Sequence, residues 1–408
     1  MKKKLIVQKY GGSSVCNAQK IMSVAKRVVS YRNKGYDVVV VVSALGDTTD
    51  ELLELASKIS KAPSERELDM LMSTGEQVSM ALLAMAVQNL GKEAISFTGA
   101  QVGIRTDASH TKARIIDVDA KRIRDEIKKG KIVIVAGFQG VSTDQEITTL
   151  GRGGSDTTAV ALAVALKADL CEIFTDVDGV YTADPRMVKN ARKLKRVSYE
   201  EMLEMASLGA QVLHARSVEV ASKFNMPLHV RSSFSKKQGT LITKEVKAME
   251  DMLVSGVTLN KNEAKITMRD VPDKPGMAGR IFSKIAKNNI NIDMIIQNVS
   301  RTGATDLSFT VVASDLPKSL KVIKDLAKEV KGGEVVYDKD IAKVSAVGIG
   351  MRSHSGVAAK MFNALAAKKI NIEMISTSEI KISCVVKKKN GEKAVKALHR
   401  AFNLSRKR

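Results

Sequence analysis

The chain has 408 residues, more than one ordinary hydrophobic core requires, so we expect about two or three domains. Its 66 Lys and Arg against 44 Asp and Glu give a formal net charge of +22, which favours anionic partners, whether polymers or metabolites. With no Trp, six Tyr and nine Phe, and with its basic residues dispersed, the chain lacks the composition of a base-stacking protein, so nucleic acid is a disfavoured partner.

The cysteines and the apolar runs of the sequence indicate the cellular compartment of the protein and whether it enters a membrane. The three cysteines, Cys16, Cys171 and Cys384, lie far apart and form no CxxC pair, which argues against a disulfide framework and a thiolate zinc site. Only residues 5–7 form an apolar run after the basic start, too few for a signal peptide. The other runs are strand-sized and shorter than the roughly 18 residues that a membrane helix needs. We predict a soluble, cytoplasmic protein with no membrane partner.

Through about residue 245, short apolar runs alternate with amphipathic stretches, which is typical of βαβ units. The predicted strands are residues 5–7, 37–42, 132–136, 172–175 and 228–230, and the predicted helices are residues 17–31, 69–90 and 155–166. Continuous Val and Ile runs suit strands that are covered on both faces, so the fold class is α/β with a mainly parallel sheet flanked by helices. We expect this first domain to span residues 1–245.

The remainder of the chain repeats itself. Residues 276–295 align without a gap with residues 356–375, and both stretches have apolar residues at helical spacing followed by a strand at 290–295 or 370–375. Further strands are predicted at 264–268 and 307–312 in the first copy and at 343–347 and 380–386 in the second. These features predict two ferredoxin-like units at 263–335 and 336–408, after a linker and first regulatory strand at 246–262. The stretch near 253–259 is a candidate extra strand for the second unit.

Two glycine-rich segments are the parts of the sequence that indicate a binding site. Residues 9–14 (KYGGSS) follow the first strand, and residues 150–156 (LGRGGSD) open a predicted helix. Glycines let backbone N–H groups approach phosphate oxygens, the helix start contributes a positive dipole, and Lys9 and Arg152 add full charges. A single Gly-Gly pair would more often be only a tight βα turn, but two such segments at the strand ends of one sheet favour phosphate binding.

Other common site signatures are missing from the sequence. It contains no GxxxxGK[ST] string and neither HRD nor DFG, so the P-loop and protein-kinase folds are not indicated. The histidines are scattered and form no HExxH, so no metal site is assigned on them; they are His110, His214, His229, His354 and His399.

Taken together, several strings resemble those of bacterial aspartate kinases in order and spacing. They are residues 7–15 (VQKYGGSSV), 43–50 (SALGDTTD), 73–76 (STGE), 151–156 (GRGGSD) and 175–186 (TDVDGVYTADPR). That family has the amino-acid kinase fold, shared with acetylglutamate, glutamate and uridylate kinases, and the C-terminal repeat resembles its paired ACT domains. The resemblance covers essentially the whole chain, and the paired ACT units favour the aspartate branch.

The resemblance implies transfer of the ATP γ-phosphoryl group to the side-chain carboxylate of L-aspartate, giving 4-phospho-L-aspartate and ADP, the entry step to lysine, threonine and methionine. This carboxylate, with a pKa of about 3.9, is already ionised at neutral pH and needs no general base. Lys9 would neutralise the transferred charge, and Asp156 would orient Lys9, with Mg²⁺ as the expected companion of the nucleotide.

The same resemblance assigns the binding residues. Glu76 would pair with the substrate ammonium and Arg152 would hold its α-carboxylate, while Ser43, Thr49 and Ser155 line the pocket. The nucleotide would be held by Lys9, Tyr10, Gly11, Gly12, Thr175, Asp176, Tyr181, Asp184 and Arg186. A surface charge in a common Gly-Glu context remains an alternative for Glu76, and a simple Asp-Gly turn remains one for residues 178–179.

The ACT resemblance further implies a homo-oligomer and a free amino-acid effector, threonine and/or lysine. Its binding residues would be Asp273, Gly276, Met277, Ala278, Asn291, Asp293 and Gln297 in the first unit and Val357, Ala358, Asn371 and Ile372 in the second. In the second unit the Asn-Ile run is equally well explained as the start of a strand. A separately translated regulatory subunit that starts near Met249 also stays open.

The sequence departs from the family at three positions. Gln211 stands where some relatives have a Lys near the phosphates, and Ala215 and Ser355 replace frequent prolines. Two other classes of function remain: an amino-acid-binding regulator or a basic nucleic-acid binder that has lost catalysis. The intact set of Lys9, Glu76, Arg152 and Asp156 argues against a regulator without catalysis.

Overall fold

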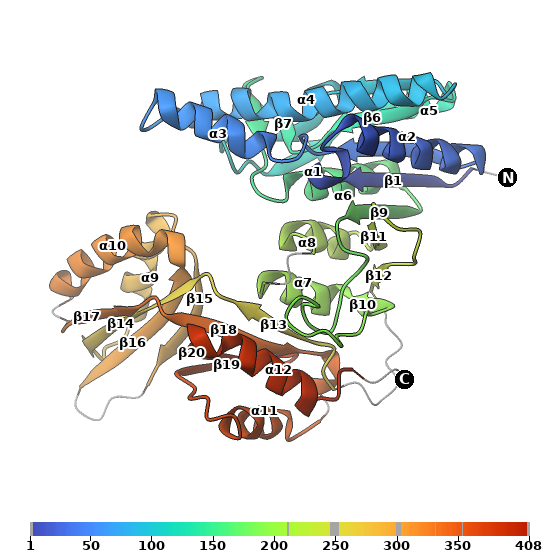
Figure 1. Cartoon of the computed structure of the whole chain (residues 1–408). Coiled ribbons are helices and arrows are strands. Elements are labelled where there is room, and N and C mark those ends of the chain that lie inside the picture. Colours follow the sequence, from blue (N-terminus) through green and yellow to red (C-terminus); the bar gives the residue numbers. More distant parts are fainter. Residues whose placement is uncertain are drawn as a thin grey trace. The chain divides into compact units, whose positions relative to one another are not determined.

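The computed structural model describes residues 3–209, 212–244, 253–298, 303–330, 332–352 and 354–405 (Figure 1). The chain divides into two compact units. The N-terminal unit consists of Met1–Val180, Lys193–Ser207 and Gln211–Lys247, and the C-terminal unit consists of Tyr181–Arg192, Leu208–Ala210 and Ala248–Arg408.

The N-terminal unit is built on an eight-stranded sheet. In spatial order its strands are β10 (Arg196–Ser198), β12 (Thr240–Thr243), β11 (Leu228–Ser232), β9 (Leu170–Thr175), β1 (Leu5–Tyr10), β2 (Asp37–Val42), β6 (Ile132–Ala136) and β3 (Ala94–Phe97). All neighbouring pairs are parallel except β11 and β12. The predicted mainly parallel sheet is therefore confirmed.

Helices cover both faces of this sheet. The helices of this unit are α1 (Gly12–Val15), α2 (Ala18–Asn33), α3 (Thr48–Ile59), α4 (Glu65–Asn89), α5 (Lys121–Lys128), α6 (Gly154–Leu166), α7 (Tyr199–Ser207) and α8 (Ala215–Lys223). Of these, α3 packs on α4, and α8 packs on α6 and α7. Helices α2 and α4 lie together on one face (Figure 1), where they pack on Val38, Val40 and Val42 of β2. Successive strand residues point to opposite faces, so Lys9, next to the core residue Tyr10 in β1, faces the side of α6.

Helix α4 is long and apolar enough to span a membrane by length and composition, which the run-length argument did not anticipate. In this structure 56% of its most apolar window is buried. Leu83, Ala84 and Val87 belong to the core formed with α2 and the sheet. Packing inside the protein therefore accounts for the apolar character of α4.

A second, small sheet lies in the N-terminal unit. Its order is β5 (Ile115–Val118), β4 (Ile104–Thr106), β7 (Gln139–Ser142) and β8 (Ile147–Thr149). No strand of this sheet was predicted, because segments of three or four residues carry too little periodicity to distinguish them from loops. Strand β8 leads directly into the second glycine-rich segment.

The C-terminal unit contains the two predicted ferredoxin-like repeats. The first has the strand order β15 (Ile292–Gln297), β16 (Ala304–Val312), β14 (Glu263–Pro272) and β17 (Val335–Asp338), with helices α9 (Met277–Lys287) and α10 (Leu316–Glu329). The second has the order β19 (Met374–Ser378), β20 (Lys381–Lys387), β18 (Ile341–Val347) and β13 (Gly256–Asn260), with helices α11 (Val357–Ala366) and α12 (Gly391–Ala401). All strand pairs in both sheets are antiparallel.

Strand β13 comes from chain that precedes the first repeat, yet it pairs with β18 in the second sheet, in the place that β17 has beside β14 in the first. The predicted strand over residues 370–375 is wrong at its start, since β19 begins only at Met374. Ile370 is buried in the core of the repeat, so its apolar character reflects packing of a loop rather than a strand.

Residues Tyr181–Arg192 belong to the C-terminal unit although they lie within the first half of the sequence. Ala183 and Val188 join the apolar core of the second repeat. The carbonyl of Thr182 accepts a hydrogen bond from the Val257 N–H (2.8 Å), and its hydroxyl lies 3.0 Å from Nε2 of His399. This segment is therefore an integral part of the repeat unit.

Candidate active site

The site is assembled at one edge of the large sheet. Strands β1, β2, β6 and β9 are parallel neighbours, so their carboxyl ends lie at the same edge. Ligands of open α/β sheets bind beyond these strand ends. The first glycine-rich segment follows β1 at this edge. The second follows β8 of the small sheet and leads into α6, so the prediction that both segments follow strands of one sheet is wrong for the second.

An ion pair joins the two glycine-rich segments. Nζ of Lys9 lies 2.7 Å from Oδ1 of Asp156, and the two side chains are only 13% and 10% exposed. A Cβ atom placed on Gly11 would lie 3.4 Å from the same Nζ, so the missing side chain leaves the ammonium open on that side. The structure thus brings together the two residues that the sequence analysis placed at the centre of catalysis.

The first glycine-rich segment is locked to the loop after β2. A Cβ on Gly12 would lie only 2.8 Å from the carbonyl oxygen of Gly46, so this close approach requires glycine. The Ser43 N–H donates to the carbonyl of Tyr10 (3.1 Å), and the Gly46 N–H donates to that of Gly12 (3.1 Å). The loop that carries Ser43 is thereby held beside Lys9, and Thr49 lies in the first turn of α3.

The second glycine-rich segment presents an open guanidinium. Gly151 and Gly153 have φ of +74° and +70°, a conformation that glycine adopts without strain. Arg152 between them is exposed and makes no hydrogen bond or ion pair within the described residues. Ser155 is buried in the first turn of α6, where a Cβ on Gly137 would lie 2.8 Å from its Oγ.

Glu76 is a buried carboxylate on α4. Its side chain is 3% exposed, and Oε1 accepts a hydrogen bond from the Ala44 N–H at 3.3 Å. Oε2 has no hydrogen-bond partner in the part of the chain that the structure describes. Burial raises the pKa of Glu76 to about 8, with backbone hydrogen bonds as a smaller opposing influence. A carboxyl group in this condition is suited to receive a cationic ligand group.

The residues predicted to hold the nucleotide divide between the two units. Thr175 ends β9, and its hydroxyl donates to the carboxylate of Asp176 (2.9 Å) in the N-terminal unit. Tyr181, Asp184 and Arg186 belong to the C-terminal unit, where Asp184 and Arg186 form an ion pair of 2.7 Å.

Two of the predicted nucleotide residues have structural contacts of their own. The Tyr10 side chain is completely buried and stacks on Phe174 with ring centres 4.7 Å apart. The Gly11 N–H donates to the carbonyl of Phe174 (3.3 Å). The ring of Tyr10 thus serves the core, and this part of the segment is tied to β9.

Two residues around the site were not predicted. Gly137 follows β6 and makes room for Ser155, and His214 packs so closely on Gly153 that a Cβ there would collide with its ring. Burial lowers the pKa of His214. No motif spacing could have revealed these contacts, because they depend on tertiary packing.

Two of the three departures from the family lie in described parts of the chain. Ala215 is the first residue of α8, a position that proline also suits, so the substitution is compatible with the helix start. Ser355 precedes Gly356, whose φ of +85° caps α11. Gln211 lies outside the described residues.

The predicted effector residues lie mainly at two helix starts in the C-terminal unit. Gly276 (φ +86°) caps α9, with Met277 and Ala278 in its first turn, and the other predicted residues of the first repeat are exposed: Asp273, Asn291, Asp293 and Gln297. Asp293 pairs with the buried Lys343, which also lies 2.5 Å from Oε1 of Glu263. The structure therefore gives Asp293 a partner within the protein.

In the second repeat, a hollow of about 450 Å³ lies beside the start of α11. Val357, Ala358, Arg352 and Glu379 contribute to its lining. Val357 is largely buried, whereas Asn371 is exposed in the stretch before β19. Ile372 packs on the core of the repeat, which gives this residue a structural role.

A mainly parallel sheet with one glycine-rich segment after β1 and a second before α6, followed by two ferredoxin-like repeats, defines a class of phosphotransferase. Residues 4–232 match the model of the Amino acid kinase family, and residues 266–329 and 344–402 each match an ACT domain model. The fold class predicted from the sequence is thereby confirmed.

Known relatives narrow the class. The chain is 55% identical over 401 residues to an aspartate kinase of Stutzerimonas stutzeri (strain A1501), covering 98% of this chain and 97% of the relative. It is 54% identical over 405 residues to an aspartokinase of Mycolicibacterium smegmatis, covering 98% and 96%. The crystal structure of E. coli aspartokinase III in complex with aspartate and ADP is 26% identical, covers 98% and 99%, and superposes with a TM-score of 0.85. The chain belongs to the aspartokinase family, as its motifs predicted.

Proposed function

We propose that this enzyme transfers the γ-phosphoryl group of ATP to the side-chain carboxylate of L-aspartate, forming 4-phospho-L-aspartate and ADP in the first step of lysine, threonine and methionine biosynthesis. The observation that carries the proposal is the Lys9–Asp156 ion pair, which joins the glycine-rich segment at the carboxyl end of β1 to the glycine-rich segment at the start of α6. The 26% identical E. coli structure contains aspartate and ADP, which supports the same substrate class.

The chemistry asks little of the protein beyond charge and alignment. The attacking carboxylate is already ionised, but it must approach a phosphoryl group that is also negative, and phosphoryl transfer depends mainly on positioning and on neutralising oxygen charge. Lys9 supplies the positive charge, and Asp156 keeps its ammonium in place at 2.7 Å. Gly11 and Gly12 leave the space beside Lys9 free of side chains.

The amino-acid head group of aspartate would be held by two opposite charges. Glu76, buried and with one free carboxylate oxygen among the described residues, would accept the ammonium. Arg152, exposed and without a partner in the same described residues, would hold the α-carboxylate in its planar fork. Ser43, Thr49 and Ser155 would line the space between them. The side-chain carboxylate would then point toward the nucleotide.

The nucleotide would bind as ATP with Mg²⁺. Magnesium bound to a nucleotide usually takes one or two protein carboxylates together with phosphate oxygens. Asp156 lies at the correct edge to be such a ligand, and within the described residues no cluster of three or more acidic, His or Cys side chains offers a separate metal site. Thr175 and Asp176, at the end of β9, would contact the nucleotide.

Threonine and/or lysine would regulate the reaction from the C-terminal unit, and the repeats would join copies of the chain into a homo-oligomer. The hollow beside α11 has a size suited to a free amino acid, and it is lined by both charged and apolar side chains. A structure of E. coli aspartokinase III in complex with lysine and aspartate, 26% identical with a TM-score of 0.75, supports lysine as an effector. The free cysteines Cys16, Cys171 and Cys384 support a cytoplasmic location.

Trapping of the product tests the proposal. The purified enzyme is incubated with ATP, MgCl₂, L-aspartate and hydroxylamine, which converts an acyl phosphate into a hydroxamate, and ADP release is followed in parallel. We expect aspartyl hydroxamate and ADP in equal amounts, both dependent on aspartate. ADP release that does not require aspartate, or that yields no hydroxamate, would refute the assignment.

A further inference from the structure

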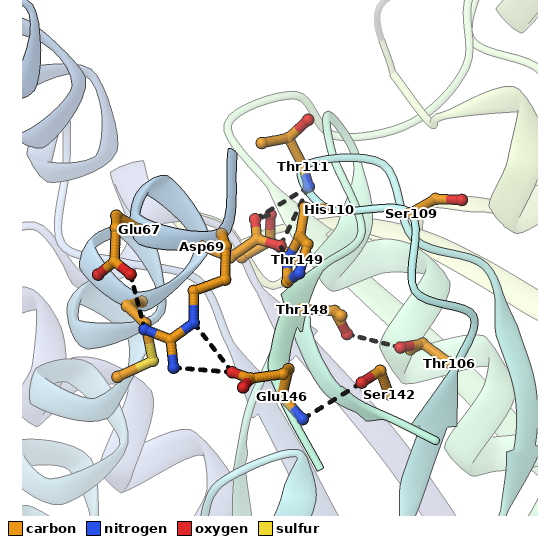
Figure 2. Close-up of polar contacts among 12 residues, drawn as sticks. Glu67, Asp69, Thr106, Ser109, His110, Thr111, Ser142, Glu146, Thr148 and Thr149 are labelled. Atoms are coloured by element: carbon orange, nitrogen blue, oxygen red, sulfur yellow. Dashed lines mark hydrogen bonds and ion pairs between the residues drawn. The ribbon is translucent and has the colours of Figure 1, made fainter. Parts of the chain in front are cut away.

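A buried carboxylate outside the recognised motifs holds the chain around the second glycine-rich segment (Figure 2). Asp69 on α4 is completely inaccessible, and its two oxygens are in contact with three residues. Nδ1 of His110 lies 2.7 Å from Oδ2, the Thr111 N–H donates from 3.0 Å, and the Thr149 hydroxyl donates to Oδ1 from 2.5 Å.

These three contacts fix two stretches of chain beside Gly151: the end of β8, which precedes it in sequence, and the loop of His110 and Thr111, which lies next to it in space. Thr149 is the last residue of β8, only three positions before Arg152. Thr111 lies on the neighbouring loop, and a Cβ on Gly151 would lie 3.0 Å from its carbonyl oxygen. The Ala113 N–H donates to the carbonyl of Thr149 (2.9 Å), which closes the connection between loop and strand. The chain on which Arg152 stands is therefore anchored to Asp69.

Helix α4 also carries Glu76, which is proposed to bind the substrate ammonium while Arg152 binds the α-carboxylate. Asp69 and Glu76 are seven residues apart on α4, which places them on one face, two turns or about 10 Å apart along the axis. A helix is rigid over two turns, so the position of the Arg152 chain is set relative to Glu76.

We infer that Asp69 is a positioning residue for aspartate: through Thr149, Thr111 and His110 it fixes Arg152 at the spacing from Glu76 that matches the α-carboxylate and ammonium of the substrate. This inference rests on the proposed function, because it assigns the head group of aspartate to Arg152 and Glu76. It extends the substrate site to residues that touch no substrate.

The Thr149→Val variant tests the inference, because it removes the hydroxyl and keeps the shape of the side chain. The KM for L-aspartate should rise about tenfold, since a hydrogen bond to a buried charged group is lost and the Arg152 chain is less well fixed. The kcat and the KM for ATP should change less than about twofold, because Lys9 and Asp156 are held by β1 and α6. Thr149→Ser, which restores the hydroxyl, should return the KM for aspartate toward the wild-type value.

The adjacent residue provides a matched control. Thr148 lies on the same strand, is equally buried, and donates or accepts a 2.6 Å hydrogen bond with the Thr106 hydroxyl instead of contacting Asp69. Thr148→Val thus removes a hydroxyl group from a position as deeply buried as Thr149. Its KM for aspartate should stay within about twofold of wild type, whatever it does to thermal stability. Equal values of KM for the two valine variants would overturn the inference.

A double mutant separates positioning from general destabilisation. If Thr149 acts through Arg152, Thr149→Val should raise the KM little further in an Arg152→Ala background, whereas independent effects would multiply. Full multiplication would contradict the inference. A second variant removes another contact of Asp69: the His110 side chain is 19% exposed, and His110→Ala should also raise the KM for aspartate. An inactive wild-type enzyme would instead refute the proposed function itself.

Discussion

The ammonium of Lys9 is fixed by Asp156 and faces the space that Gly11 leaves open. We expect Lys9→Ala to lower the turnover of aspartate-dependent ADP release by roughly 10² to 10³, because one well-aimed donor contributes about 2.7 to 4 kcal/mol to lowering the barrier. Lys34→Ala, at the exposed end of α2, is the control that removes a surface lysine. A loss of turnover below about threefold would show that Lys9 does not serve the transfer.

Glu76 should make aspartate binding depend on pH. Its pKa of about 8 means that the carboxyl group is mostly protonated at neutral pH in the free enzyme, whereas the ionised form attracts the substrate ammonium. The KM for aspartate should therefore fall as pH rises from about 6.5 to about 8.5. Glu76→Gln should have a high KM that no longer varies in this window. Parallel pH profiles for the two proteins would rule out this role of Glu76.

Glu76 should also lower stability at alkaline pH. The pKa is 4.5 in the unfolded reference and about 8 in the folded protein, so between these values the native state binds more protons and stability falls as pH rises. Glu76→Gln removes the ionisable group and with it this loss of stability at high pH. Calorimetry should show a higher unfolding temperature for the variant than for wild type at pH about 8.5, with a difference that shrinks toward pH about 5. A difference independent of pH would contradict the buried ionisation.

At the scale of elements, two helical glycines should respond oppositely to alanine. A Cβ on Gly75 in α4 would lie 2.8 Å from the Cβ of Ala44, whereas a Cβ on Gly279 in α9 would meet no atom within 4 Å. Alanine gains about 0.5–1 kcal/mol over glycine in a helix, and overpacking costs about 1–3 kcal/mol. Thermal unfolding should therefore show Gly279→Ala to be stabilising and Gly75→Ala destabilising. Equal shifts would mean that α4 can move away from Ala44 without cost.

The elements also show where sequence patterns are informative. The Val and Ile runs of β2 and β6 were predicted residue for residue, because strands buried on both faces leave continuous apolar runs. The small sheet was missed, since its strands have only three or four residues. The stretch near 253–259 is a candidate strand of the second unit by its sequence, and β13 pairs there with β18. The register of this pairing joins residues about 85 positions apart, which local periodicity does not encode.

The candidate site was predictable to the extent that it is local in sequence. The two glycine-rich strings indicated an anion-binding edge, and the structure brings Lys9 and Asp156 from these strings into contact. The burial of Tyr10 and the packing of His214 on Gly153 could not be predicted, because both arise between distant segments. The contacts of Asp69 with His110 and Thr149 span 41 and 80 positions, and no motif includes them.

For the whole molecule, occupancy of the C-terminal unit should alter the affinity for aspartate. We expect lysine and threonine to change this affinity by a coupling of about 1–3 kcal/mol, measured as the shift in the aspartate titration with each effector and with both. Ala358→Leu, which fills part of the hollow beside α11, should weaken the response. An unchanged affinity with both effectors present would contradict regulation by these amino acids.

The membership of Tyr181–Arg192 in the C-terminal unit bears on a product that starts near Met249. Such a product would hold both repeats and β13 but would lack this stretch. The Val257 amide and the His399 ring would each lose a bond to Thr182, and the places of Ala183 and Val188 in the core would be open to water. A shortened regulatory chain would therefore have an incomplete core in its second repeat. A full-length copy of the chain could complete that core by binding its own Tyr181–Arg192 stretch there.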